Sequence, residues 1–261
     1  MVDPLITFVH ISDLHLPART SVVLDGRPNA HASARAVIAQ VNALPFPVEL
    51  VLITGDVGHD PGHESDYLAV KSTVSQFLPK FYVMAGNHDR SKWLHHVVMG
   101  RVPDTYYYAF QANGVQFACL DSSVKNSHHG KLGEDQLAWL DALVSIPSDQ
   151  PLVVALHHHP IVLGSQSMDS IRLTDGEALH RILLKARHRI RCVLFGHIHE
   201  SVTIIRDGIT YASTHSTWFQ SRSWHGQDDF QKDVIHTPGF NVVTLMPNGD
   251  TFIRAFRAPV G

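Results

Sequence analysis

Six short runs of apolar and β-branched residues recur along the chain and predict buried strands. They cover residues 5–12, 48–53, 80–85, 115–120, 151–156 and 190–195. Four longer stretches between them carry apolar residues at positions i, i+3, i+4 and i+7, the spacing of a helix with one buried face. These stretches are residues 31–44, 65–78, 134–145 and 175–188. The alternation of strands and helices predicts an α/β fold whose central strands are largely buried.

The last quarter of the chain has a different pattern, which predicts two β-hairpins. Asp207-Gly208 and Asn248-Gly249 each lie between apolar, β-branched stretches, and such dipeptides favour tight turns. Residues 214–238, between these hairpins, are aromatic and polar without periodicity, so we expect a long surface loop there. We expect residues 1–261 to form a single domain with two sheets, in which 214–238 either caps the site or mediates oligomerisation.

Composition narrows the range of partners. The formal net charge is −3, whereas proteins that bind nucleic acid or anionic membranes usually have a basic excess. No apolar run approaches the roughly 18 residues of a membrane span, and the first residues lack the basic region of a signal peptide. We therefore expect a cytoplasmic protein without membrane attachment. Cys119 and Cys192 lie in predicted strands without metal-binding spacing, which predicts buried free thiols.

Polar residues with ligand chemistry follow five of the six predicted buried strands. The stretches are SDLH, TGDVGHD, AGNHD, HHHP and GHIHE, in a sequence that contains 20 histidines. In open α/β sheets, functional groups gather beyond the carboxyl ends of the strands. These stretches are therefore expected to converge, although they extend from Asp13 to His199.

The residue types in these stretches favour a metal centre. Carboxylate, amide and imidazole ligands suit Mn²⁺, Fe, Zn²⁺, Ni²⁺ or Co²⁺, and the absence of thiolate from the set argues against a structural zinc site. Asp13 and His15 are two residues apart, as are His197 and His199. In extended backbone such pairs project on the same side. Asp56 has two oxygens and can bridge two ions about 3.5–4 Å apart, which would generate a hydroxide and hold phosphoryl oxygens.

Each stretch alone also has a simpler explanation. Asp13 can cap a turn, Gly55-Asp56 is a common turn dipeptide, and Asn87 can be the left-handed residue of a turn. The occurrence of all five stretches in order after five strands favours the metal centre. In the triplet 157–159, strand alternation puts His157 and His159 on one face and His158 on the other.

The ordered motifs D-x-H, G-D, G-N-H-D, an H-x-P histidine and G-H-x-H resemble those of the calcineurin-like metallophosphoesterases, over about residues 11–200. The resemblance implies a four-layer α/β/β/α sandwich of two mixed sheets with flanking helices, and a dinuclear metal centre at one edge. It implies that the ligands of one ion are Asp13, His15 and His199, that those of the other are Asn87, His158 and His197, and that Asp56 bridges.

The same resemblance assigns roles around the two ions. The family ligand stands two residues before the proline, which selects His158 and leaves His157 pointing back into the scaffold. His88 matches the histidine that contacts the substrate phosphate or the leaving-group oxygen, and Asp89 would orient it. His159 and His215 are further candidates for substrate contact.

The segments GKLGEDQLAWLDALV and HHHPIVLGSQSMDSIRL narrow the resemblance to the class III cyclic-nucleotide phosphodiesterases, which include the bacterial cyclic AMP phosphodiesterase and a glycerophosphodiesterase relative. This implies hydrolysis of small phosphodiesters, 3',5'-cyclic nucleotides first, by in-line attack of a metal-bridging hydroxide. The two ions would be Fe, Mn, Zn or Co, and a homodimer is one expected assembly. The alternatives are a broader esterase acting on monoesters, nucleotides, glycerophosphodiesters or phosphonate esters, and a non-catalytic metal- or nucleotide-binding protein.

Overall fold

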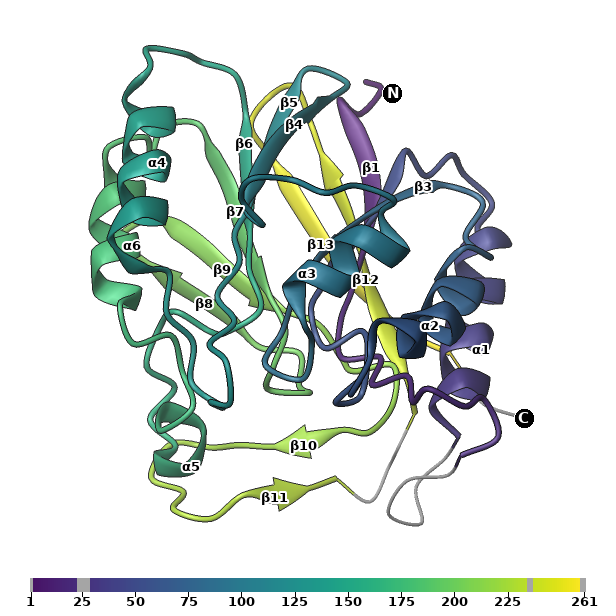
Figure 1. Ribbon diagram of the computed structural model, residues 1–261. Helices are drawn as coiled ribbons and strands as arrows, with labels where there is room; N and C mark the ends of the chain where they lie inside the picture. The colour runs from purple at the N-terminus through teal and green to yellow at the C-terminus, as the bar shows by residue number, and fades with distance from the viewer. Residues whose placement is uncertain (1, 23–28, 234–236, 259–261) are drawn as a thin grey trace.

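The computed structural model describes residues 2–22, 29–233 and 237–258. Two large sheets lie face to face, and helices cover their outer faces (Figure 1). Within the described residues, the first sheet has five strands in the order β13-β12-β1-β2-β3. Their bounds are β1 Ile6–Ile11, β2 Leu50–Thr54, β3 Lys80–Met84, β12 Gly239–Leu245 and β13 Thr251–Arg257.

The second sheet has six strands within the same described ranges, in the order β4-β5-β6-β7-β9-β8. Their bounds are β4 Tyr108–Ala112, β5 Val115–Cys119, β6 Leu152–Ala155, β7 Ile190–Phe195, β8 Thr203–Arg206 and β9 Ile209–Ser213. Strands β1, β2 and β3 are parallel, as are β5, β6, β7 and β9, and antiparallel strands complete both sheets. The parallel strands of each sheet therefore end at a common edge.

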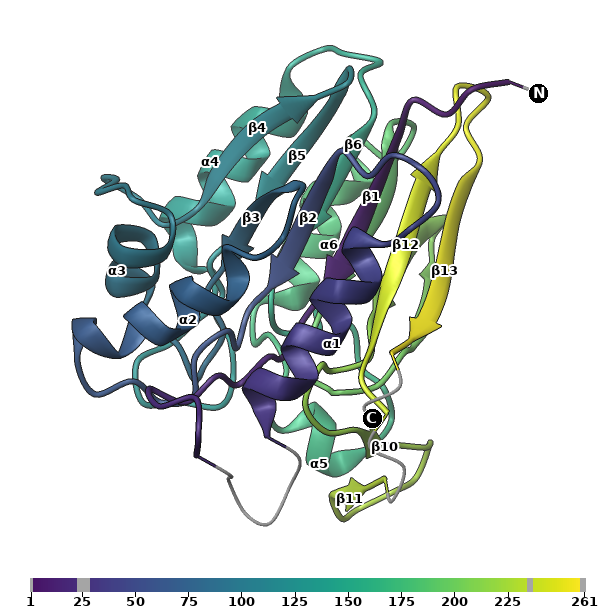
Figure 2. The same ribbon diagram turned by 90° about the vertical axis from the view of Figure 1, so that its right-hand side faces the viewer.

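Helices from the two halves of the chain cover different sheets (Figure 2). The helices on the first sheet are α1 Ala30–Asn42, α2 Tyr67–Val74 and α3 Ser91–Trp93, which continues into a π-helical segment, Leu94–Val98. Those on the second sheet are α4 Gly133–Ser145 and α6 Gly176–Leu184. Two shorter pieces, the 3₁₀ turn Glu64–Asp66 and α5 Gln166–Asp169, lie in loops.

Three apolar layers hold these elements together. The helices and the first sheet enclose residues such as Val9 and Val37, while Phe8 and Phe117 meet edge-on between the sheets with ring centroids 5.3 Å apart. A third layer joins α4 and α6 to the second sheet. The predicted α/β/β/α sandwich is thus confirmed, and Cys119 and Cys192 are buried and free as expected.

The predicted helices and hairpins form, with one difference in the length of a helix. The predicted helix 65–78 is regular only over α2, and a turn leads to Pro79, which disfavours helical backbone in the residue before it. The hairpins join different sheets, β8–β9 the second and β12–β13 the first. In the described part of the chain, no helix is both long enough and apolar enough to cross a membrane.

The segment 214–238 is not simply a surface loop. It contains two short paired strands, β10 Ser221–Arg222 and β11 Gln231–Lys232. Trp218 is 1% exposed and Phe219 is 8% exposed, so the first part of the segment is packed into the protein. Residues 234–236 of this segment lie outside the described residues.

Candidate metal centre

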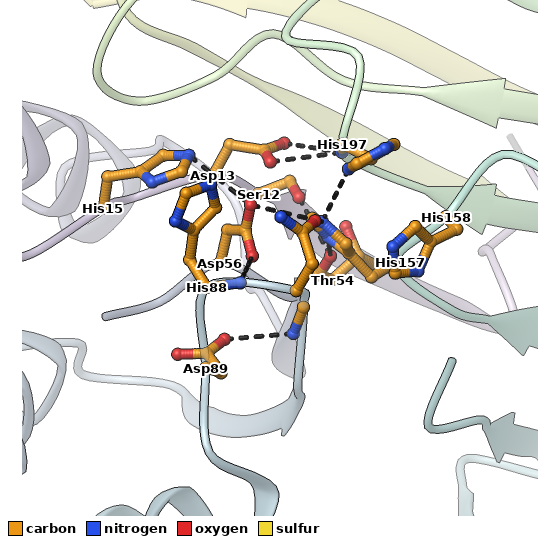
Figure 3. Close-up of polar contacts among 12 residues, drawn as sticks. Ser12, Asp13, His15, Thr54, Asp56, His88, Asp89, His157, His158 and His197 are labelled. Carbon is orange, nitrogen blue, oxygen red and sulfur yellow. Dashed lines mark hydrogen bonds and ion pairs between the residues drawn. The ribbon is translucent and has the colours of Figure 1, made fainter. Parts of the chain in front are cut away.

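Loops that follow β1, β2, β3, β6 and β7 meet at one edge of the two sheets and bring the predicted ligands together (Figure 3). Main-chain hydrogen bonds connect these loops. The backbone N–H of Asp13 donates to the Gly55 carbonyl at 3.1 Å, and that of His15 donates to the Asp56 carbonyl at 2.8 Å. The Asp13 carboxylate accepts the backbone N–H of His197 at 3.0 Å. The site thus depends on the parallel strand order of both sheets.

Three of the predicted ligands, Asp13, His15 and His199, form one cluster. Their ligand atoms all lie within 4.8 Å of one another. Nε2 of His199 is 3.4 Å from Oδ1 of Asp13 and 3.1 Å from Nε2 of His15. Burial lowers the pKa of both imidazoles, which favours the neutral form that binds metal.

A second cluster lies beside the first and contains Asn87, His157 and His197. Nε2 of His157 is 3.2 Å from Oδ1 of Asn87 and 3.1 Å from Nδ1 of His197. Asp56 lies between the clusters, because its Oδ2 is 3.3 Å from Nε2 of His157 and 3.6 Å from Nε2 of His15. One carboxylate therefore contacts a member of each cluster.

Two buried carboxylates, Asp13 and Asp56, determine the charge of this region. Burial acts to raise the pKa of Asp56, but His157 and His15 lower it well below its usual value. Burial likewise acts to lower the pKa of His157, but Asp56 and Asp13 raise it to about 9. The pocket therefore attracts positive charge, as a cation site must.

The triple histidine departs from the prediction in one respect. The expectation that His157 points back into the scaffold is wrong, because its Nε2 faces Asn87 and Asp56. His158 instead directs Nδ1 to the Ser122 hydroxyl at 2.8 Å and lies beside His197, with ring centroids 4.5 Å apart. The error came from the spacing to Pro160 that the family resemblance implied. His157 and His158 do point in different directions, as alternation predicted, although both lie beyond the end of β6 at Ala155. His157 faces Asn87 and Asp56, whereas His158 contributes to a cluster with His157 and His197 whose ligand atoms lie within 4.8 Å of one another, so both remain candidate ligands.

The other two histidines proposed for substrate contact lie outside the two clusters, although the His159 ring is stacked 5.9 Å from that of His197. His159 is completely buried and its ring is 6.4 Å from that of Phe195, so its predicted place at the border of a substrate pocket is not supported. His215 is half-buried and packs against Gly239 at the start of β12. It belongs to neither of the two clusters described above, and its role in substrate binding stays a prediction.

Main-chain carbonyls fix the orientation of three inward-facing imidazoles. Nδ1 of His157 lies 2.8 Å from the carbonyl oxygen of Thr54. Nε2 of His197 is 3.0 Å from that of Ile171, and Nδ1 of His199 is 2.9 Å from that of Phe219. A carbonyl only accepts, so each of these nitrogens carries the proton, and in the neutral ring the opposite nitrogen has its lone pair free. This is how metal-binding histidines are generally held.

His88 stands next to the centre and is oriented by Asp60. Its backbone N–H donates to Oδ1 of Asp56 at 2.9 Å, and Nδ1 of its ring is 2.9 Å from Oδ2 of Asp60. Burial acts to lower the pKa of His88, but Asp60 and Asp56 outweigh this and raise it. His88 is thus suited to donate a proton or to stabilise negative charge.

Asp89 does not orient His88, contrary to the prediction. Its carboxylate accepts the backbone N–H groups of Val57 at 3.0 Å, Gly58 at 2.8 Å and Gly86 at 3.0 Å. Burial, with the charge of Asp56, raises the pKa of Asp89 to about 6. Asp89 therefore holds two loops together. The sequence offered one signal for Asp60, its position four residues after Asp56 in the same loop.

The backbone at the ligands is unusual. Among the described residues, nine non-glycine residues have positive φ, and five of these are predicted ligands. They are Asp13 at 55°, His15 at 47°, Asp56 at 48°, His197 at 71° and His199 at 51°. The D-x-H and H-x-H pairs therefore converge through left-handed turns and not through extended backbone. Such conformations cost energy and cluster at functional sites.

The start of segment 214–238 packs directly on the ligand-bearing loops. The Trp218 ring is 5.1 Å from that of His15, and the Phe219 ring is 4.1 Å from that of His199. The Ser216 hydroxyl donates to the Asp13 carbonyl at 2.8 Å. Figure 1 shows β10 and β11 running below this edge of the sheets towards α5. The segment forms a wall of the centre, and its role as a cap or in oligomerisation stays a prediction.

The fold and the site together define the class of protein. Two sheets with helices outside, and two adjoining clusters of residues that could bind metal on either side of Asp56, suit a metal-dependent hydrolase. The sequence profile of the calcineurin-like phosphoesterases matches residues 6–201. The chain belongs to this family, and the predicted enzyme class, a metal-dependent hydrolase of phosphate esters, is confirmed.

Known proteins support this assignment over most of the chain. A 3',5'-cyclic adenosine monophosphate phosphodiesterase of Pseudomonas aeruginosa is 30% identical, with 95% of this chain and 88% of that protein covered. A probable glycerophosphodiester phosphodiesterase of Arcobacter nitrofigilis is 28% identical, over 76% and 73% of the two chains. The solved structure of a dimetal phosphatase from Danio rerio has the same fold, with a TM-score of 0.73, 16% identity, and 99% and 100% of the two chains covered.

Proposed function

We propose that the protein is a dinuclear metal-dependent phosphodiesterase that hydrolyses small diesters, 3',5'-cyclic nucleotides such as cyclic AMP first. The observation that carries the proposal is the Asp56 carboxylate, which lies within 3.6 Å of His15 in one cluster and within 3.3 Å of His157 in the other. Relatives named as cyclic AMP and cyclic-nucleotide phosphodiesterases, at 30% and 28% identity over nearly the whole chain, support the substrate class.

The proposed ligands of one ion are Asp13, His15 and His199, those of the other are Asn87, His157 and His197, and Asp56 serves both. This donor set suits Fe, Mn, Zn or Co. Such ions, when bound, supply positive charge to the phosphoryl oxygens and activate water. His88 then holds a proton beside the leaving-group oxygen, and Asp60 keeps its ring in place. Asp89 contributes by tying the loop of Asn87 to that of Asp56.

The choice between His157 and His158 can be tested directly. We expect His157→Gln to reduce the metal content from two ions to one, because it removes the imidazole that faces Asn87 and Asp56. His158→Gln is a matched change in the next residue, and we expect it to retain both ions. Metal analysis after dialysis measures the content, and thermal melting shows whether each variant is folded. Loss of an ion in His158→Gln alone would restore the original assignment.

A substrate panel tests the proposed reaction. We expect metal-loaded protein to hydrolyse bis-p-nitrophenyl phosphate and cyclic AMP faster than p-nitrophenyl phosphate, when assayed in turn with Mn²⁺, Fe²⁺, Zn²⁺ and Co²⁺. Faster turnover of the monoester would favour the broader esterase. No turnover of any of the three with any metal would favour a non-catalytic metal- or nucleotide-binding protein.

Other features of the proposal rest on the sequence. We keep the expectation of a small-molecule substrate in place of a nucleic-acid polymer, because the net charge is −3. The homodimer and the cytoplasmic location also stay predictions.

A further inference from the structure

Four histidines, His15, His157, His197 and His199, direct one ring nitrogen into the proposed centre. They differ in the group that hydrogen-bonds the other ring nitrogen. His157, His197 and His199 each direct this nitrogen to a main-chain carbonyl, at 2.8, 3.0 and 2.9 Å. For His15 the partner is a side chain, because its Nδ1 lies 3.3 Å from Nδ1 of His59. One of the four imidazoles is therefore held by a group that a substitution can remove.

The direction of this hydrogen bond follows from the role of His15. Nε2 of His15 faces Asp56 and His199, so its lone pair must be free there if it is to bind an ion. The proton of the neutral ring is then on Nδ1, which donates to Nδ1 of His59. In this arrangement His59 acts as the acceptor, the part that carbonyl oxygens play for the other three imidazoles.

His59 is itself firmly placed. Its backbone N–H donates to the Leu16 carbonyl at 3.0 Å. Its ring is stacked on that of His88, with centroids 5.4 Å apart and planes 10° apart, and its edge contacts Trp218 at 5.3 Å. An acceptor held in this way can fix both the tautomer and the rotation of the His15 ring.

We propose that His59 is a positioning residue for His15, and that the ion held by Asp13, His15 and His199 depends on it. This inference rests on the proposed dinuclear centre. It predicts an asymmetric defect: loss of His59 weakens the binding of one ion and leaves the ion held by Asn87, His157 and His197 in place.

Two variants separate the hydrogen bond from the bulk of the ring. His59→Phe keeps an aromatic ring against His88 but has no acceptor. His59→Asn places its amide oxygen near the position of Nδ1 and restores an acceptor. The control is His63→Phe, an equivalent change at an exposed histidine of the same loop. Metal-free protein of each variant is titrated with Mn²⁺ by calorimetry, and far-UV circular dichroism checks its fold.

We expect wild type to bind two ions, and His63→Phe to bind both with the same affinities as wild type. In His59→Phe, we expect one of the two ions to bind about 10–100-fold more weakly, and in His59→Asn most of this loss to be recovered. Wild-type affinity for both ions in His59→Phe would overturn the inference, as would an equal loss in His59→Asn. If wild type itself bound fewer than two ions, the proposed dinuclear centre would fail, and the inference with it.

Discussion

Asp56→Asn is expected to empty both metal positions and reduce diester hydrolysis to background. The change keeps the size of the side chain and an oxygen for the backbone N–H of His88, which donates to Oδ1 at 2.9 Å. It removes the negative charge that lies between His15 and His157, and with it the group that can hold two ions at once. Metal analysis and turnover of bis-p-nitrophenyl phosphate measure the two effects.

A surface aspartate provides the control for this change. Asp141 pairs with Lys185 on the exposed side of the second sheet's helices, and exposed ion pairs contribute only about 0–1 kcal/mol to stability. We therefore expect Asp141→Asn to keep two ions and full activity. Retention of both ions and full activity in Asp56→Asn would contradict the proposed mechanism.

His88→Ala is expected to separate these two effects, because it should retain both ions and lose turnover. The His88 ring is held by Asp60 and lies outside the proposed ligand set. Positioned proton donors typically contribute about 10²–10⁴-fold to rate, so we expect kcat to fall by that amount. The measurement is kcat together with metal content, and loss of an ion would instead identify His88 as a ligand.

Asp60→Asn refines the prediction for His88. Asp60 contributes to raising the pKa of His88, so removal of its charge lowers that pKa. If the protonated ring is the active form, activity is lost as the pH rises through this pKa. The alkaline limb of the kcat profile should therefore move to lower pH in Asp60→Asn, with a smaller fall in kcat than in His88→Ala. An unchanged pH profile would show that Asp60 does not set the pKa of His88 during catalysis.

The sequence predicted the fold and the meeting of the five loops because both follow from strand order. Buried apolar runs alternate with amphipathic helices, and parallel strands release their loops at one edge. Asp13, Asp56 and His199 could therefore be brought together without coordinates. Their convergence depends on topology alone and not on the detailed course of any loop.

The errors arose where a result depended on local backbone geometry. His157 was misplaced because the family spacing, counted back from Pro160, selected His158, and that spacing does not fix which imidazole the chain turns towards Asp56 beyond the end of β6 at Ala155. Asp60 was missed and Asp89 was given its role because adjacency in sequence was taken for adjacency in space. A turn at Asp60, with φ of 46°, brings that carboxylate to His88 instead.

The left-handed backbone at Asp13, His15, Asp56, His197 and His199 has a consequence for how this protein can change over time. Glycine adopts such conformations without steric cost, whereas other residues are held there at the expense of roughly 1–3 kcal/mol each. Relief of backbone strain alone would favour glycine at these five positions, so the aspartates and histidines persist there against that strain. In a copy of the protein released from its catalytic role, we expect glycine at the three histidines sooner than at Asp13 and Asp56, because these carboxylates also accept the backbone N–H groups of His197 and His88.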